Sequence, residues 1–243
     1  MTLTIHPLDL GTLTVDRSGL TLRTGLGNKL QISCLAWLIL GGAEPVLVDT
    51  GPKPDVDWGT RYHNPFACAD RQSLERQLAR HGISPSEIRT VVLTHLHWDH
   101  CYGNHLLPRA RFVVQRSEFE YAKDPLHCDR PIYECDINPP PYMVGVESFE
   151  LVDGDFDVCR GVRTVLMPGH TPGLQGVLVQ TGDRRILLGS DHFPLFENIE
   201  QNIPTGIVHS LPDWYAASAR SREFCDLILP GHDWTVLNSE SYQ

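Results

Sequence analysis

The stretch VVLTHLHWDHCYGN, residues 91–104, places three histidines and one aspartate within six positions, directly after a short apolar run. The apolar run predicts a buried strand. In an extended chain, residues i and i+2 lie on one side with their Cα atoms about 6.6 Å apart, so His95 and His97 can reach one ion. Asp99 and His100 follow where the chain must turn, and they can face a second ion.

The alternative for these four residues is a polar strand end whose histidines hydrogen-bond carbonyl groups or one another. Four polar groups crowded at a buried strand end without a cation would leave unsatisfied or repelling atoms, which is costly. Imidazole and carboxylate ligands suit Zn²⁺ and also Mn²⁺, Fe²⁺ or Co²⁺. The pattern therefore predicts a metal site after the strand.

Three further ligand-type residues follow apolar runs elsewhere in the chain. His170 lies in MPGHTPG, Asp191 in LLGSDH and His232 in LILPGHD. Each comes near Gly or Pro, just past the end of a predicted strand. Ligands placed beyond several strand ends meet at one rim of a scaffold, so we expect these residues to join the 95–100 cluster.

Strands and helices mix along the whole chain, and two runs of consecutive strands favour two packed sheets with helices outside. We see no linker or break in composition, so residues 1–243 are expected to form one domain. The predicted strands cover 12–15, 32–40, 46–49, 90–94, 111–115, 162–167, 174–180, 185–188 and 226–229. The predicted helices cover 71–81, a short helix opened by a capping box at 84–87, 117–123 and 213–224.

Composition excludes several classes of protein. The 243 residues include 30 acidic and 20 basic side chains, a net charge of −10, which argues against nucleic acid or an anionic membrane as partner. No apolar stretch approaches the ~20 residues of a membrane span, and the N-terminus does not read as a signal peptide. The seven cysteines are scattered and lack CxxC spacing, so we expect reduced thiols and a cytoplasmic protein.

One segment, residues 124–146, has five prolines and no clear periodicity. Long irregular segments of compact domains are usually functional lids or disordered. Tyr133, Tyr142 and Met143 favour a packed lid, and the alternative is a plain surface excursion. The same side chains could instead form a contact between two copies of the chain in a homodimer.

Taken together, LVDTG at 47–51, HLHWDH at 95–100, GHTPG at 169–173, Asp191 and PGH at 230–232 resemble the metallo-β-lactamase fold superfamily, in the same order and over almost the whole chain. The resemblance implies an α/β fold, a four-layer αββα sandwich with the site at one edge. It also implies two divalent ions, Zn²⁺ foremost. Asp49 would support a ligand from behind, since ligating histidines usually donate their other N–H group. The implied ligands are His95, His97 and His170 for metal 1, Asp99, His100 and His232 for metal 2, and Asp191 as the bridge.

Within the superfamily, the run at 72–104 is most similar to the compact lactonases that open N-acyl homoserine lactones. This implies a small-molecule lactone or related ester as substrate, attacked at its carbonyl by a metal-bridging hydroxide, with Asp99 and Asp191 as catalytic groups. Those lactonases commonly have Tyr three residues after the bridging Asp, whereas this chain has Pro194. The candidates for contacting substrate in its place are His192, Tyr102, Tyr133 and Tyr142.

Two alternatives stay open at this point. A thioesterase of the glyoxalase II type, or another ester or amide hydrolase of the superfamily, would share the metal residues. Glyoxalase II usually carries a C-terminal helical region, and only 11 residues follow His232 here. A non-catalytic metal-binding scaffold would be expected to lose one or more ligands, and all seven are present.

Overall fold

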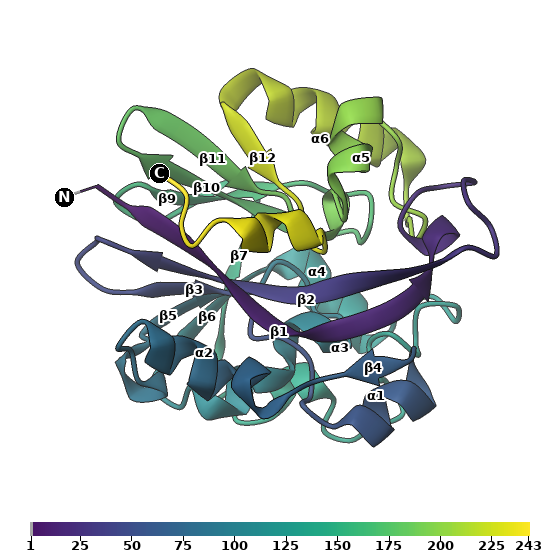
Figure 1. Ribbon diagram of the computed structural model, residues 1–243, viewed down its shortest axis with the longest axis horizontal. Coiled ribbons are helices and arrows are strands. Elements are labelled where there is room, and N and C mark those ends of the chain that lie inside the picture. Colours follow the sequence, from purple (N-terminus) through teal and green to yellow (C-terminus); the bar gives the residue numbers. More distant parts are fainter. Residues whose placement is uncertain (1) are drawn as a thin grey trace.

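The computed structural model describes residues 2–243, and its two β-sheets are stacked face to face with helices on both outer sides (Figure 1). The seven-stranded sheet has the order β4-β1-β2-β3-β5-β6-β7, and the five-stranded sheet has the order β12-β11-β10-β9-β8. In Figure 1, α5 and α6 cover the upper sheet, and α1, α2 and α3 lie below the lower one. The expected four-layer αββα sandwich is confirmed.

The strands are β1 (Thr4–Asp16), β2 (Lys29–Leu40), β3 (Val46–Val48), β4 (Phe66–Ala67), β5 (Thr90–Val92), β6 (Arg111–Gln115), β7 (Phe149–Val152), β8 (Phe156–Cys159), β9 (Val162–Leu166), β10 (Gln175–Thr181), β11 (Arg184–Leu188) and β12 (Leu227–Leu229). The α-helices are α1 (Val56–Tyr62), α2 (Leu74–Arg80), α3 (Trp98–Cys101), α4 (Arg116–Lys123), α5 (Phe196–Gln201) and α6 (Leu211–Phe224). Short 3₁₀ turns include η3 (Pro85–Glu87), η5 (Pro141–Met143) and η6 (Ser190–His192).

Strand β2 shows why the sandwich has helices on its outside. Its odd-numbered residues 35, 37 and 39 enter the core between the sheets, where they join Val177 and Val179 of β10. Its even-numbered residues 34, 36 and 38 enter a second core on the side of α2 and α3. Because side chains alternate along a strand, a run that is apolar at every position needs a cover on both faces. A third core, around Trp214 of α6, covers the outer face of the five-stranded sheet.

The direction of the strands decides where the site forms. Strands β3, β5, β6 and β7 are parallel neighbours, and β11 is parallel to β12. The carboxyl ends of parallel neighbours lie at the same edge of a sheet. The loops that follow β5, β11 and β12 are the ones that contain the 95–100 cluster, Asp191 and His232.

Several element boundaries differ from the sequence prediction. Strand β1 begins at Thr4 rather than at residue 12. Its pairing with β2 shifts register between Asp9 and Thr12, where Gly11 has φ +138°. The strand continues through this irregularity, and the alternating pattern that marks it in the sequence is interrupted there. Strands β7 and β8 were not predicted, since they are short edge strands with half-exposed residues. The capping box at Ser84 forms, with Ser84 N–H donating to Glu87 Oε2 at 2.8 Å, but it opens only a 3₁₀ turn.

Segment 124–146 packs against the body of the protein. Tyr133 and Tyr142 are buried in the core beside α3. The carbonyl of Ile132 accepts from Trp98 N–H at 3.0 Å, and the carbonyl of Tyr142 accepts from Asn104 Nδ2 at 3.2 Å. The segment therefore holds α3, which carries part of the candidate site, and the plain surface excursion is wrong.

The structure bears on the expectations for the cysteines and for membrane-spanning segments. All seven cysteines are free thiols. Among residues 2–243, no helix combines the length and apolar character needed to cross a bilayer.

We expect the core between the sheets to dominate stability. Ile39, 1% exposed, lies in that core, so Ile39→Ala should lower the free energy of unfolding by about 2–5 kcal/mol through lost burial and a residual cavity. Leu26, 86% exposed, is the control, and Leu26→Ala should change the free energy of unfolding by less than about 0.5 kcal/mol. Urea unfolding followed by circular dichroism measures both, and equal losses would contradict this account of the core.

Candidate metal centre

All seven side chains expected to bind metal converge at one edge of the sandwich, although they come from four separate stretches of chain. His95 and His97 follow β5, Asp99 and His100 lie in α3, and the others follow β9, β11 and β12. Three groups of potential ligand atoms each lie within 4.8 Å of one another. The groups are His95, His97 and His170; His95, His100 and Asp191; and Asp99, His100 and His232.

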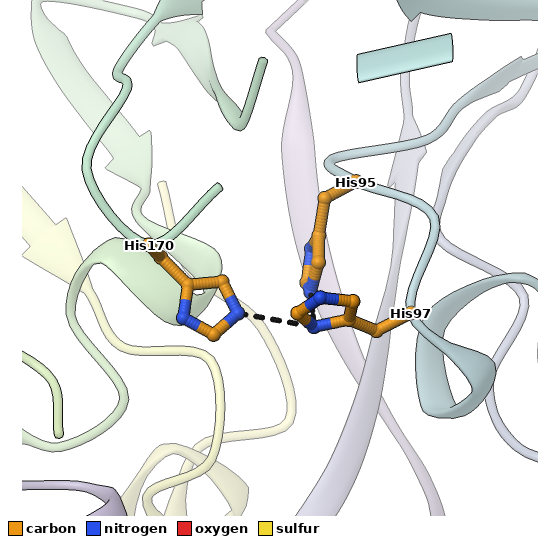
Figure 2. A group of neighbouring side chains, drawn as sticks. All are labelled: His95, His97 and His170. Atoms are coloured by element: carbon orange, nitrogen blue, oxygen red, sulfur yellow. Dashed lines mark hydrogen bonds between the residues drawn. The ribbon is translucent and has the colours of Figure 1, made fainter. Parts of the chain in front are cut away.

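The first group consists of three histidines whose ring nitrogens face a common point (Figure 2). His97 Nδ1 lies 3.0 Å from His95 Nε2 and 3.1 Å from His170 Nε2. Burial, followed by the neighbouring imidazoles, holds the pKa of His95 and of His97 well below the usual range. Neutral rings keep a lone pair, which a metal ion requires of an imidazole ligand.

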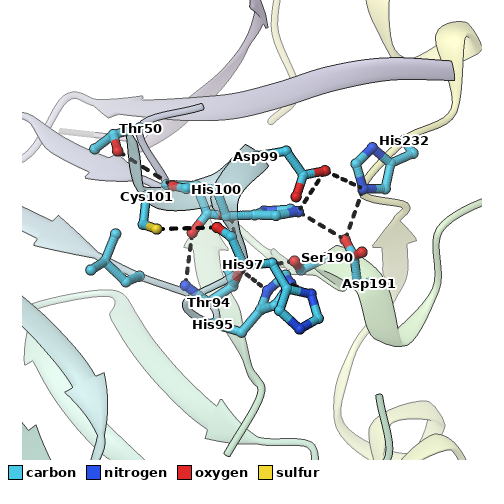
Figure 3. Close-up of polar contacts among 12 residues, drawn as sticks. Thr50, Thr94, His95, His97, Asp99, His100, Cys101, Ser190, Asp191 and His232 are labelled. Carbon is cyan, nitrogen blue, oxygen red and sulfur yellow. Dashed lines mark hydrogen bonds and ion pairs between the residues drawn. The ribbon is translucent and has the colours of Figure 1, made fainter. Parts of the chain in front are cut away.

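Asp191 approaches ligands of both halves of the centre, and Figure 3 shows it beside His100 and His232. Its Oδ1 is 3.0 Å from His232 Nε2 and 3.2 Å from His100 Nε2, whereas its Oδ2 is 3.5 Å from His170 Nε2. Burial raises the pKa of Asp191, but His232 and His100 outweigh it and hold that pKa well below the usual range. The carboxylate is thus ionised, with one oxygen facing each half.

The donor set fits two divalent cations. Among residues 2–243, His100 Nε2 and Asp191 Oδ1 are buried and have no well-aligned hydrogen-bond partner. Buried polar atoms normally have partners, and five imidazoles with two carboxylates offer borderline-to-hard donors for Zn²⁺-like ions. Asp99 is less buried than the histidines, with 12% of its side chain exposed, and its Oδ2 is 3.8 Å from His100 Nε2 and 3.9 Å from His232 Nε2.

The outer nitrogens of three ligand histidines are hydrogen-bonded to a backbone carbonyl or a carboxylate. His170 Nδ1–H donates to the carbonyl of Ile207, and His232 Nδ1–H donates to the carbonyl of Ser33, both at 2.7 Å. His100 Nδ1 lies 2.8 Å from Asp49 Oδ2. A proton on Nδ1 leaves Nε2 free as a ligand, so these contacts fix both the tautomer and the direction of each ring.

Asp49, the third residue of the LVDTG motif, follows β3 in a strained turn with φ +60°. Besides His100, it accepts hydrogen bonds from Thr94 N–H at 2.7 Å and from Thr94 Oγ1 at 2.8 Å. The turn continues at Gly51, where φ is +78° and a Cβ atom would collide with Leu10. Asp49 therefore lies behind His100 and contacts its outer nitrogen.

The four expected substrate contacts have different surroundings. Tyr102 is partly exposed, and its ring lies 5.8 Å from Lys53 Nζ. The Tyr133 ring packs edge-on against His97 at 4.6 Å, but its hydroxyl donates to the buried Glu118. Of these two side chains, Tyr102 is the one with exposed surface, and its hydroxyl has no hydrogen-bond partner among residues 2–243.

The other two expected contacts are packed in the interior. His192 is fully buried and stacks on Trp214 with ring centroids 5.0 Å apart, and burial lowers its pKa to about 3. Tyr142 is buried beside Phe119 and Phe149. Neither is placed to meet a substrate, because aromatic side chains cover both rings.

Sequence reasoning missed Glu118. It lies in α4, which reads as an ordinary surface helix, yet its carboxylate is completely buried and accepts three hydrogen bonds. A lone Glu among charged neighbours gives no sequence signal for such a role.

Comparison with known proteins agrees with this geometry. The sequence profile of the metallo-beta-lactamase superfamily matches residues 31–232. A fold of two stacked sheets with a paired histidine-carboxylate centre at one edge defines that class, and the chain belongs to the metallo-β-lactamase superfamily.

Several similar proteins are N-acyl homoserine lactonases. An N-acyl homoserine lactonase of Bacillus cereus is 28% identical over 203 residues, 80% of this chain and 77% of that protein. The N-acyl homoserine lactonase AttM of Agrobacterium fabrum is 26% identical over 248 residues, 94% of this chain and 92% of that protein. A crystal structure of an N-acyl homoserine lactone hydrolase, with N-hexanoyl-L-homoserine at its catalytic metal centre, superposes with a TM-score of 0.82 at 25% identity and covers 98% of this chain and 96% of that one.

We predict that Asp49→Asn weakens metal binding without unfolding the protein. The amide can still accept from Thr94 N–H, but its NH₂ group would face His100 Nδ1 and favour the tautomer with the proton on Nε2. That proton would block the nitrogen facing Asp191, and the affinity of one metal equivalent should fall by about 10–100-fold. Competition with a chromophoric chelator measures the affinity, and unchanged Zn²⁺ binding by the variant would show that Asp49 does not set this tautomer.

Proposed function

We propose that this protein is a metal-dependent hydrolase that opens lactones, with N-acyl homoserine lactones as the leading substrate class. The observation that carries the proposal is the two-part donor set, with Asp191 between a group of three histidines and a group of Asp99, His100 and His232. Membership of the superfamily and relatives that are N-acyl homoserine lactonases support the same reaction.

In this proposal, His95, His97 and His170 would hold one divalent ion, Asp99, His100 and His232 would hold a second, and Asp191 would be a ligand available to either. Zn²⁺ is the proposed ion because the ligands are imidazoles and carboxylates at short range. Two such ions supply polarisation of the substrate carbonyl and a water whose pKa is lowered towards neutrality. The proposed location is the cytoplasm, where the seven free cysteines would stay reduced.

The protein's own groups orient the ligand imidazoles and transfer a proton. Ile207, Ser33 and Asp49 keep three imidazoles aimed at the centre through their outer nitrogens. Asp99 faces His100 and His232 of one half of the centre, whereas Asp191 faces both halves, so Asp99 is the ligand carboxylate that we propose carries a proton to the alcohol oxygen that leaves when the ring ester bond breaks. No serine or cysteine nucleophile is needed, and the thiol of Cys101 is buried with its pKa raised by that burial.

Pro194 occupies the position of the usual lactonase Tyr, and its carbonyl accepts from His232 N–H at 2.9 Å. This position therefore supports the His232 loop through its backbone. We propose Tyr102 as the residue that contacts substrate in its place, because its side chain is partly exposed next to α3.

A substrate panel tests the proposed function. The purified protein should contain about two equivalents of divalent metal and hydrolyse lactones with a higher kcat/KM than thioesters, β-lactams or phosphodiesters. Chelation should abolish turnover and Zn²⁺ should restore it, while circular dichroism stays unchanged because the core does not depend on metal. A thioester as the fastest substrate would favour the glyoxalase II-like alternative, and a metal-free protein would contradict the proposal.

Replacement of the bridging carboxylate gives a second test. Asp191→Asn removes the charge and one oxygen donor, so turnover should fall by well over about 100-fold, more than the loss typical of supporting residues. Asp183→Asn, in the exposed turn between β10 and β11, is the matched control and should leave turnover and thermal stability unchanged. Wild-type turnover in the Asp191 variant would remove that residue from the centre.

A further inference from the structure

Glu118 is a buried carboxylate at which three separate parts of the chain meet. Its Oε1 accepts from Leu96 N–H at 3.0 Å and from Tyr133 Oη–H at 2.7 Å. Its Oε2 accepts from Thr171 Oγ1–H at 2.6 Å. The side chain has no exposed surface, so these hydrogen bonds offset the free-energy cost of removing the carboxylate from water.

Two of the three donors belong to the loops that carry the three-histidine group. Leu96 lies between His95 and His97 in the loop after β5, and Thr171 follows His170 in the loop after β9. One carboxylate thus joins the two loops across which His97 Nδ1 and His170 Nε2 lie 3.1 Å apart.

The loop after β9 also lies directly against α4. A Cβ atom at Gly173 would collide with the backbone nitrogen of Glu118. The third donor, Tyr133, packs its ring against His97 at 4.6 Å. Each of the three hydrogen-bond donors to Glu118 therefore either adjoins a ligand histidine in the sequence or packs its ring against one.

We propose that Glu118 is a positioning residue that fixes the spacing of the two histidine loops and so sets the metal affinity of the three-histidine group. The inference rests on the metal centre of the proposed function but not on the identity of the substrate. It is tested by metal binding, which remains measurable whatever the protein hydrolyses.

Two substitutions at this position separate hydrogen bonding from charge. In Glu118→Gln, the amide oxygen can accept from Leu96 and Tyr133, and the NH₂ group can donate to the Thr171 hydroxyl, which serves as donor or acceptor. Glu118→Leu has a similar size but removes all three hydrogen bonds. If spacing is what matters, Gln should keep the affinity and Leu should lose it.

Asn198 of α5 offers a matched control. It is also fully buried and also makes three hydrogen bonds, accepting from Leu195 N–H and donating to the carbonyls of Leu20 and Ile203. None of these partners belongs to a loop of the three-histidine group. Asn198→Leu should therefore cost stability as Glu118→Leu does, while leaving the affinity for Zn²⁺ unchanged.

The experiment strips the purified full-length protein of metal and titrates it with Zn²⁺ in competition with a chromophoric chelator, with urea unfolding measured alongside. For Glu118→Leu, one of the two Zn²⁺ equivalents should bind about 10–100-fold more weakly, whereas Glu118→Gln should stay within about threefold of wild type. Should Glu118→Leu not fold, Thr171→Val, which removes only the contact at Oε2, should show a smaller loss in the same direction.

The outcomes distinguish the inference from the proposed function. Wild-type Zn²⁺ affinity in Glu118→Leu or, where that variant does not fold, in Thr171→Val would overturn the inference, as would an equal loss of affinity in Asn198→Leu. A protein that binds two Zn²⁺ but opens no lactone would contradict the proposed function alone, and the Glu118 series would still be decisive. A wild-type protein that takes up no Zn²⁺ would overturn both.

Discussion

The structure depends on one electrostatic constraint, the burial of five imidazoles and two carboxylates at the same edge of a sandwich. Such groups repel or remain unpaired unless cations lie among them and oxygen atoms hold them from behind. The carbonyls of Ile207 and Ser33 and the carboxylate of Asp49 supply the oxygens. The inward nitrogens are then left facing one another, which is an arrangement suited to metal ions and unfavourable without them.

This constraint explains where the backbone is strained. Asp49 and Ser190 both have positive φ, +60° and +46°, at the ends of strands that lead into the site. Backbone strain of this kind persists only where the surroundings enforce it. Here a hydrogen bond of 2.9 Å between Thr94 Oγ1 and Ser190 Oγ connects the loop of one sheet to the loop of the other. The strained turns are therefore held by the same contacts that align the ligands.

The sequence predicts the parts of this centre that depend on spacing. HLHWDH follows an apolar run, and the other ligands follow strand ends near Gly or Pro, so the sequence alone predicts that they converge. The sequence does not reveal residues or strands whose surroundings leave no repeating apolar pattern. Glu118 belongs to a charged helix, His192 adjoins Asp191 but stacks on Trp214, and β7 and β8 have half-exposed faces. Long-range packing decides each of these, and no local pattern records it.

The centre has two parts, and each is supported by its own buried carboxylate. Asp49 accepts from Thr94 N–H and aligns His100, whereas Glu118 accepts from Leu96 N–H and lies behind the three-histidine group. Those two amides flank His95, so the backbone on either side of one ligand is held by acids from two different elements. Burial raises the pKa of both acids, and the hydrogen bonds that they accept oppose this rise. Because Asp49 and Glu118 hold the backbone at Thr94 and Leu96, on either side of His95, we expect a change in this short stretch to disturb both halves of the centre.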